Sequence, residues 1–369
     1  MKRREFIQKA SLVAAAGLTC GLDRLFAESP IALAAGVPQP PQPPKPPSLF
    51  AGPNPPYAQE IPATPFDAPP GSWTLVGMPD TQNMDQGEYS RQTEWIVAHQ
   101  KSHNILFVAH EGDIVEVSTD LDNWKRAQTA MRILTDAGIP YALLPGNHDL
   151  GRPDSLLDRV TDVHHSFSRF TYLNNYFSAE DYRHSEAMGL FEPGKMENSW
   201  HTFTAPTGDY LLVALEYAPR NEAVEWADRI VAQCPTRKVI ILTHAYTNCD
   251  NTTRVKLDIT PAGRDSANDG DQIWEKLVRK HRNIFLVLSG HVCNTGTGYL
   301  VSTGNHGQRV HQILANYQAL VVPHRPYHGG AYLRLMQFYP DGETVQVKSY
   351  SPWLDDWLMT PDQQFRFTI

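Results

Sequence analysis

Five short polar clusters in the sequence contain the side chains that bind divalent metals, and each cluster follows an apolar run. They are Asp80-Thr81-Gln82, Gly112-Asp113-Ile114-Val115-Glu116, Gly146-Asn147-His148-Asp149, Thr243-His244 and Gly290-His291-Val292-Cys293. Carboxylates, imidazoles, a carboxamide oxygen and a thiolate are ligands of cations such as Zn, Fe and Mn. If the fold brings the five clusters together, we expect them to form one metal site.

The apolar runs before these clusters are short and rich in β-branched residues, which is typical of buried strands. The predicted strands are Trp73–Met78, Ile105–Ala109, Tyr141–Leu144, Tyr210–Leu215, Val239–Thr243 and Ile284–Ser289. Amphipathic stretches predict helices at Tyr89–His99, Asn123–Ala137, Glu222–Gln233 and Gln272–His281. This alternation predicts an α/β fold, in which side chains just past the carboxyl ends of neighbouring strands converge on one crevice. Glycines in the clusters permit tight turns directly after the strands.

The C-terminal region predicts an antiparallel hairpin instead. Tyr332–Phe338 and Thr344–Tyr350 flank Pro340-Asp341-Gly342, whose composition favours a turn.

The ordered set of clusters, from Asp80 to His291, resembles the calcineurin-like metallophosphoesterases. Their pattern runs Asp-x-His, Gly-Asp-x-x-Asp, Gly-Asn-His-Asp/Glu, His and Gly-His-x-His. The resemblance implies a four-layer α/β/β/α sandwich with C-terminal antiparallel strands, and two divalent metal ions, Zn, Fe or Mn. It also implies that Asp113 bridges the two metals and that the second metal is completed by Asn147, His244 and His291.

Both departures from the family pattern fall on the first metal, whose implied ligands are Asp80, Gln82, Asp113 and Cys293. Gln82 and Cys293 each stand where the family has histidine. An Asp-Thr-Gln first motif occurs in exported bacterial members that this chain resembles. A carboxamide oxygen is a harder and weaker ligand than imidazole, whereas a thiolate is soft and suits Zn or Fe.

Three interpretations of the first metal site remain open from the sequence. The metal binds through Asp80, Gln82 and Asp113 with or without Cys293, or it binds through another group such as His110, His306 or a water, or it is absent.

The resemblance implies hydrolysis of a phosphate mono- or diester by a hydroxide that the metals activate. His148 is then the proton donor to the leaving group, and Asp149 orients or charge-balances its imidazole. The alternative is a non-catalytic, metal-stabilised extracytoplasmic binding protein with a degenerate first site.

The segment 151–200 is predicted to be a long insert on the substrate side of the site. Its aromatic residues and arginines include Arg169, Tyr176, Phe177 and Arg183. Such side chains can stack on a base or sugar and clamp a phosphate, or they can pack a structural flap against the sandwich. The residues involved in substrate binding stay unassigned.

The N-terminus predicts export. Arg3-Arg4 followed by Phe6, an apolar run and Ala32-Leu33-Ala34 resembles a twin-arginine signal over residues 1–34, and an ordinary secretory signal is the alternative. Residues 35–70 are rich in proline and predict a linker or arm, and residues 71–369 predict the catalytic domain. We expect a periplasmic or extracellular protein.

Net charge and the length of the apolar runs argue against nucleic-acid polymers as partners and against a membrane span. The formal net charge of −8 disfavours binding to nucleic-acid polymers, which requires a positive surface. The sequence holds no apolar run of the roughly 18–20 residues that a membrane span needs. The expected partner is a small phosphate ester. Cys234 and Cys249 could form one disulfide, which would leave Cys293 unpaired.

Overall fold

The computed structural model describes residues 59–60, 69–151, 168–257, 266–293, 296–319 and 329–369. All of them belong to one unit, Pro47–Ile369. The predicted signal, residues 1–34, lies outside the described residues, as does most of the predicted linker 35–70 and part of the predicted insert 151–200.

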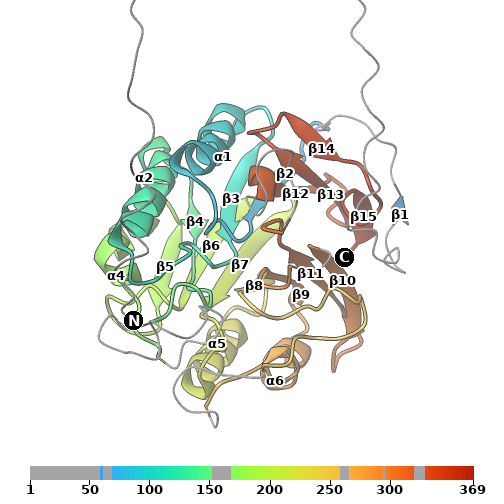
Figure 1. Ribbon diagram of the computed structural model, residues 1–369. Coiled ribbons are helices and arrows are strands. Elements are labelled where there is room, and N and C mark those ends of the chain that lie inside the picture. Colours follow the sequence, from blue (N-terminus) through green and yellow to red (C-terminus); the bar gives the residue numbers. More distant parts are fainter. Residues whose placement is uncertain (1–58, 61–68, 152–167, 258–265, 294–295, 320–328) are drawn as a thin grey trace, which may run out of the picture. The chain divides into compact units, whose positions relative to one another are not determined.

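The first sheet has eight strands and contains the N- and C-terminal parts of the unit (Figure 1). They are β1 (Gln59–Glu60), β2 (Trp73–Met78), β3 (Ile105–His110), β4 (Tyr141–Ala142), β12 (Leu333–Phe338), β13 (Thr344–Ser351), β14 (Asp356–Leu358) and β15 (Phe365–Thr368). Their order is β1-β15-β13-β12-β2-β3-β4, with β14 paired to β13. β2, β3 and β4 are parallel, while β12 pairs antiparallel with β2 and with β13. The predicted C-terminal hairpin is therefore confirmed.

The second sheet has seven strands from the middle of the chain. They are β5 (Ala187–Leu190), β6 (Ser199–Ala205), β7 (Gly208–Leu215), β8 (Lys238–Thr243), β9 (Ile284–Ser289), β10 (Thr297–Thr303) and β11 (Arg309–Ala315). In the order β10-β11-β9-β8-β7-β6-β5, the central strands β11, β9, β8 and β7 are parallel, and the outer strands are antiparallel.

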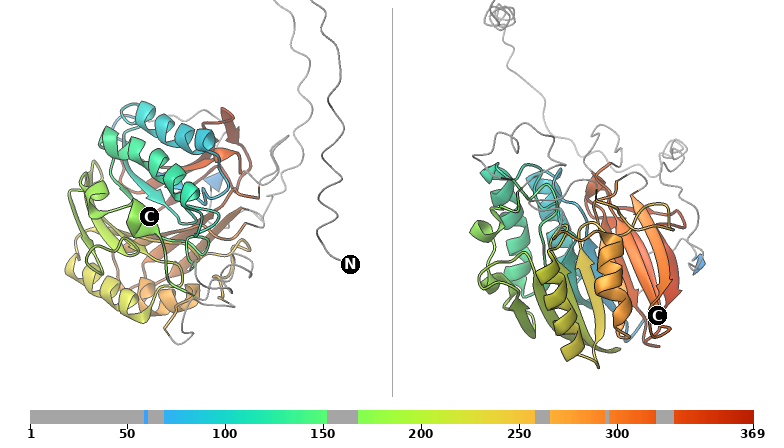
Figure 2. Two further views of the ribbon diagram at one scale, coloured as in Figure 1. Left: turned by 60° about the vertical axis from the view of Figure 1, so that its left-hand side comes forward. Right: turned by 90° about the horizontal axis from the view of Figure 1, so that it is seen from below.

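Helices cover the outer face of each sheet, which confirms the four-layer α/β/β/α sandwich (Figure 2). The helices are α1 (Gln86–His99), α2 (Leu121–Ala137), α4 (Leu173–Tyr176), α5 (Asn221–Gln233) and α6 (Gly270–Lys276). One apolar cluster joins α1 and α2 to the first sheet, and another joins α5 and α6 to the second.

A third apolar cluster lies between the two sheets. Within β2, Leu75 belongs to this inner cluster and Val76 to the cluster under the helices, as the two-residue period of a strand requires. Trp73 stacks on Phe338 there, with ring centroids 4.1 Å apart. Since both faces of these strands are covered, their sequences read as continuous apolar runs.

Helix α1 begins three residues before the predicted start because of a capping box. The Asp85 side chain accepts the Glu88 backbone N–H, and the Glu88 carboxylate accepts the Asp85 N–H. The α-helical part of α6 ends at Lys276, and the predicted continuation is a 3-10 turn, Val278–Lys280.

The described part of the predicted insert, residues 151 and 168–200, contains short helical and strand elements joined by turns. It contains α4 and β5, and Phe177 and Tyr182 are buried in the cluster under α2. The Tyr182 hydroxyl bonds the backbone of Leu143. These two aromatic side chains therefore hold a flap against the sandwich. The segment predicted as a linker contributes β1, which pairs with β15.

Candidate metal centre

The loops that follow the parallel strands of both sheets bring the five polar clusters together. Asp80 follows β2, Asp113 follows β3 and Asn147 follows β4, whereas His244 and His291 come directly after β8 and shortly after β9. A chain of contacts links Gln82 to Asp113, Asp113 to His244 and His291 to Asp80. The predicted convergence at the carboxyl ends of the strands is confirmed.

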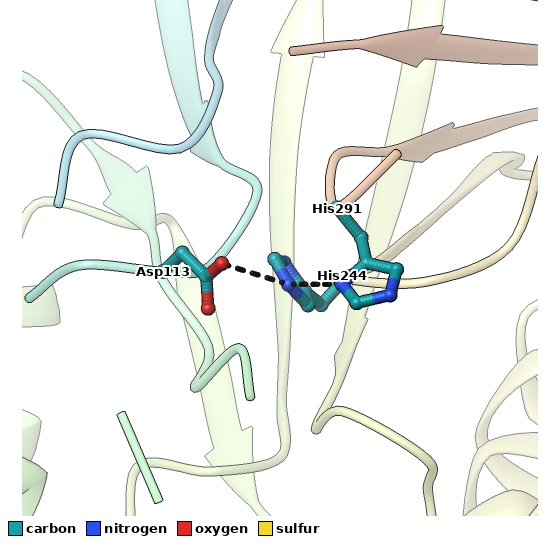
Figure 3. Close-up of side chains that lie close together, drawn as sticks. All are labelled: Asp113, His244 and His291. Carbon is teal, nitrogen blue, oxygen red and sulfur yellow. Dashed lines mark hydrogen bonds and ion pairs between the residues drawn. The ribbon is translucent and has the colours of Figure 1, made fainter. Parts of the chain in front are cut away.

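Four polar atoms, one each from Asp113, Asn147, His244 and His291, form the centre of this site, and Figure 3 shows three of these residues, Asp113, His244 and His291. His244 Nε2 lies 2.9 Å from Asn147 Oδ1, 3.3 Å from Asp113 Oδ2 and 3.2 Å from His291 Nδ1. Two ligand atoms that share a cation at about 2.0–2.1 Å lie about 3 Å apart, so these spacings fit one divalent ion. Among the described residues, Asp113, His244 and His291 are the group of acidic, histidine and cysteine side chains that could hold a metal.

The backbone sets the tautomer of His244. Its Nδ1 lies 2.8 Å from the carbonyl oxygen of Glu111. Since a carbonyl oxygen only accepts, Nδ1 carries a proton, and Nε2, which faces the cluster, is the ring atom that would bind a metal. This arrangement is common in histidine ligands of metals.

Three proposed ligands adopt left-handed backbone conformations. The φ angles of Asp80, Asp113 and His291 are 44°, 48° and 69°. Such angles cost about 1–3 kcal/mol in a residue other than glycine and are concentrated at functional sites. The turn after each strand is thus made by the ligand residue itself.

The glycines of the motifs provide space for the carboxylates. A Cβ atom on Gly146 would overlap Asp113 Oδ1, and one on Gly290 would overlap Asp80 Oδ2. Close approach, rather than turn formation, is what requires glycine at these two positions.

Asp113 is buried, yet its surroundings favour the carboxylate. Burial alone would raise its pKa, but the neighbouring His244 and His148 outweigh that effect and hold the pKa of Asp113 below its usual range. The His148 backbone N–H also donates to Asp113 Oδ1. Asp113 is therefore ready to accept a cation.

The imidazole of His148 is held by Glu116, not by Asp149. Its Nδ1 lies 3.0 Å from the Glu116 carbonyl oxygen and 3.4 Å from Glu116 Oε2. Burial lowers the pKa of His148, but Asp113 and Glu116 outweigh it, so the pKa lies above the ordinary value. Glu116 belongs to the polar cluster of Asp113, but the sequence interpretation assigned it no specific role.

Asp149 has a different place from the one predicted. Its carboxylate accepts the backbone N–H groups of Ile114, Val115 and Gly146. These three donors direct its oxygens to the backbone, so Asp149 does not orient His148 as predicted, but its charge contributes to raising the pKa of His148, as the predicted charge balance requires. Through these hydrogen bonds Asp149 connects the loop that contains Asp113 to the loop that contains Asn147.

The proposed ligands of the first metal lie less close together than those of the second metal. Gln82 Nε2 lies 3.2 Å from Asp113 Oδ2. Asp80 accepts the backbone N–H of His291. Neither Asp80 nor Cys293 joins the Asp113 group described above.

Cys234, Cys249 and Cys293 are free thiols, so the disulfide considered between Cys234 and Cys249 is not formed.

The two histidines considered as substitute ligands do not fit. His110 Nε2 contacts the hydroxyls of Thr81 and Tyr89, and its Nδ1 accepts the Gly112 N–H. Burial, and then the charge of His244, lower the pKa of His110 to about 3. His306 Nε2 lies 2.9 Å from the Lys280 carbonyl oxygen, on an exposed turn.

An aromatic ring that the sequence interpretation missed covers the two histidines that are proposed as ligands. The Tyr217 ring centroid lies 5.7 Å from His244 and 5.6 Å from His291. Arg169, from the predicted insert, donates to the carbonyl oxygens of Tyr217 and Ala218 and pairs with Glu216. The insert thus reaches the site through a backbone clamp on the loop after β7.

No helix among the described residues combines the length and apolar composition that crossing a bilayer requires.

Comparison with known proteins finds similar chains among curated sequences and among solved structures. The chain is 31% identical over 294 residues to the uncharacterized protein YvnB of Bacillus subtilis, a match that covers 77% of this chain and 20% of YvnB. The chain thus spans about a fifth of the length of that relative. A dimetal phosphatase from Danio rerio aligns with 14% identity and a TM-score of 0.46, covering 80% of this chain and 98% of the other. GAP50, the anchor in the inner membrane complex of Plasmodium, aligns with 11% identity and a TM-score of 0.40. The alignment covers 80% of this chain and 89% of GAP50.

A family model describes the region that builds the site. The model of the calcineurin-like phosphoesterases matches residues 75–295, from β2 to just beyond Cys293, which is more than half of the chain. The chain belongs to the calcineurin-like phosphoesterase family.

Proposed function

We propose that this protein is an exported, metal-dependent phosphoesterase that hydrolyses a small phosphate mono- or diester. The observation that carries the proposal is the convergence of Asp113, Asn147, His244 and His291 in a buried cluster whose spacings fit a divalent ion. Family membership supports the same chemistry.

The donor set is proposed to hold two cations. Asn147, His244 and His291 would bind the second, Asp113 would contact both, and the first would take Asp80, Gln82 and Cys293. Gln82 Oε1, which is buried and has no hydrogen-bond partner within the described parts of the chain, supports a cation at the first position. Bound there, two divalent cations supply Lewis-acid stabilisation and make a water molecule more acidic.

His148 is proposed to move a proton. Its Nδ1 is bonded to the carbonyl oxygen of Glu116, which leaves the proton transfer to Nε2 on the opposite side of the ring. The backbone N–H of His148 is bound to Asp113, so the ring is positioned from the same carboxylate that would contact the metals. In this proposal Nε2 protonates the leaving oxygen of the ester.

The direct test is to measure hydrolysis and metal content together on the purified protein. We expect about two metal ions per chain and hydrolysis of p-nitrophenyl phosphate or its bis-ester that a chelator abolishes and Zn, Mn or Fe restores. Cys293→Ala in the same assay should lower zinc affinity at one of the two sites if the thiolate is a ligand. Metal-loaded protein with no activity on either ester or on a panel of alkyl phosphates would favour the non-catalytic, metal-stabilised binding protein.

Export through the twin-arginine route is proposed from residues 1–34 and has its own test. Changing Arg3 and Arg4 together to Lys keeps the charge but removes the paired guanidinium groups. The double variant is expected to accumulate in the cytoplasm of a bacterial host, measured by cell fractionation and immunoblotting. Export at the wild-type level would point to an ordinary secretory signal instead.

A further inference from the structure

Gln318, three residues beyond the end of β11, contacts the candidate metal centre although it belongs to none of the five polar clusters. We infer that Gln318 Oε1 is a ligand of the first metal, so that a pair of carboxamides, Gln82 and Gln318, takes the place of an imidazole there. The inference rests on the proposed function in that it assumes a metal at the first position.

The contacts of the Gln82 amide carry this inference. Its Nε2 donates to Asp113 Oδ2 at 3.2 Å and also to Gln318 Oε1. The Gln82 side chain is 1% exposed, and its Oε1 has no hydrogen-bond partner among the described residues. A carboxamide oxygen buried without a partner costs about 1–3 kcal/mol.

A bound cation would favour the opposite orientation of the Gln82 amide. Oxygen atoms of Asp113 and Gln318 meet at one nitrogen of Gln82, the group that carries the partial positive charge. A half-turn of the Gln82 amide brings Oε1 to the place of the nitrogen, where it meets the oxygens of Asp113 and Gln318, and moves the nitrogen to the place of the unpartnered oxygen. Three converging oxygens repel each other unless a cation lies between them, and they form the donor set of a hard divalent ion.

The backbone positions Gln318 firmly enough for such a role. Asn316 is fully buried, its N–H donates to the Gly296 carbonyl at 2.8 Å, and its Oδ1 accepts the Gln318 N–H at 2.9 Å. Between them, the buried Tyr317 hydroxyl contacts Ser349 at 2.7 Å. The half-buried Gln318 therefore extends from a fixed stretch of chain to the Gln82 amide.

The two metal sites consequently differ in chemistry. The second site has two imidazole nitrogens with a carboxamide and a carboxylate oxygen, a mixed set that suits zinc. Gln318 makes the first site richer in oxygen, which shifts its preference toward manganese or magnesium.

The test compares manganese binding by the full chain and three variants, using equilibrium dialysis with metal analysis and titration calorimetry. The wild type is expected to bind about two Mn ions per chain. Gln318→Ala should weaken one of the two sites by roughly 10- to 100-fold and leave the other unchanged. Gln318→Glu, which keeps an oxygen at the same place and adds charge, should retain both ions. Gln233→Ala, which removes an exposed glutamine at the end of α5, is the matched control and should equal the wild type.

Two Mn ions bound by Gln318→Ala with wild-type affinity would overturn the inference, as would the loss of one ion in Gln318→Glu. A wild type that binds only one Mn at saturation would overturn it as well. Hydrolysis is measured separately on the same samples. A wild type with two ions and no activity would reject the proposed function alone, and an active wild type with an unaffected Gln318→Ala would reject the inference alone.

Discussion

His244→Ala is expected to remove one metal ion per chain and to lower kcat/KM for a phosphate ester by about 10³-fold. The ring nitrogen of His244 lies within 3.3 Å of the other three proposed ligand atoms, so its removal disrupts the whole cluster. A factor of 10³ corresponds to about 4 kcal/mol of transition-state stabilisation, the range expected for loss of a Lewis acid. Metal content by plasma emission spectroscopy and steady-state kinetics measure the two effects.

The matched control for His244→Ala is His306→Ala, which removes a histidine on an exposed turn. That variant should keep its metal and its activity. Unchanged metal content in His244→Ala would show that the metal is bound elsewhere, and metal loss in His306→Ala would make His306 a ligand after all.

His148→Ala is expected to keep both metals and to lose activity in proportion to how poor the leaving group is. The ring is held by Glu116 and lies outside the Asp113 group, so its removal leaves the ligands in place. A nitrophenolate leaves without a proton, whereas an alkyl alcohol requires one, so the loss should be near zero for the first and roughly 10²- to 10⁴-fold for the second. Rates for a series of phosphate esters with leaving groups of rising pKa measure this gradient.

An equal loss for every leaving group would assign His148 to substrate binding or to structure. Loss of metal from His148→Ala would make it a ligand. The companion variant Glu116→Gln keeps the carbonyl that bonds Nδ1, so it should preserve the gradient with a smaller loss than His148→Ala.

The strands and the polar clusters that follow them were predictable because a short stretch of sequence is enough to indicate each one. A short apolar run with a polar turn indicates a buried strand wherever it occurs, and β2 and β9 match their predicted limits. Helix starts were less accurate, since the capping box at Asp85 adds a turn without adding an apolar residue. The edge strands β5 and β10 were not predicted because their half-exposed sequences do not form clear apolar runs.

Side-chain partners depend on tertiary packing, and there the sequence interpretation failed in specific ways. Asp149 is adjacent to His148 in the sequence, yet its carboxylate faces three backbone amides, while Glu116 reaches the imidazole from another loop. Adjacent residues on a tight turn point in different directions, so proximity in the sequence does not decide which groups meet.

The sequence by itself determined the residue types of the metal centre, their order and the strands that carry them, because each motif is a strand followed by a turn. Only the tertiary structure decided that Gln318 meets Gln82 across 236 residues of sequence, and that Tyr217 covers His244 and His291. These contacts arise where loops from two sheets pack over one crevice. Their geometry follows from sheet register and loop packing, which no short segment of the chain encodes.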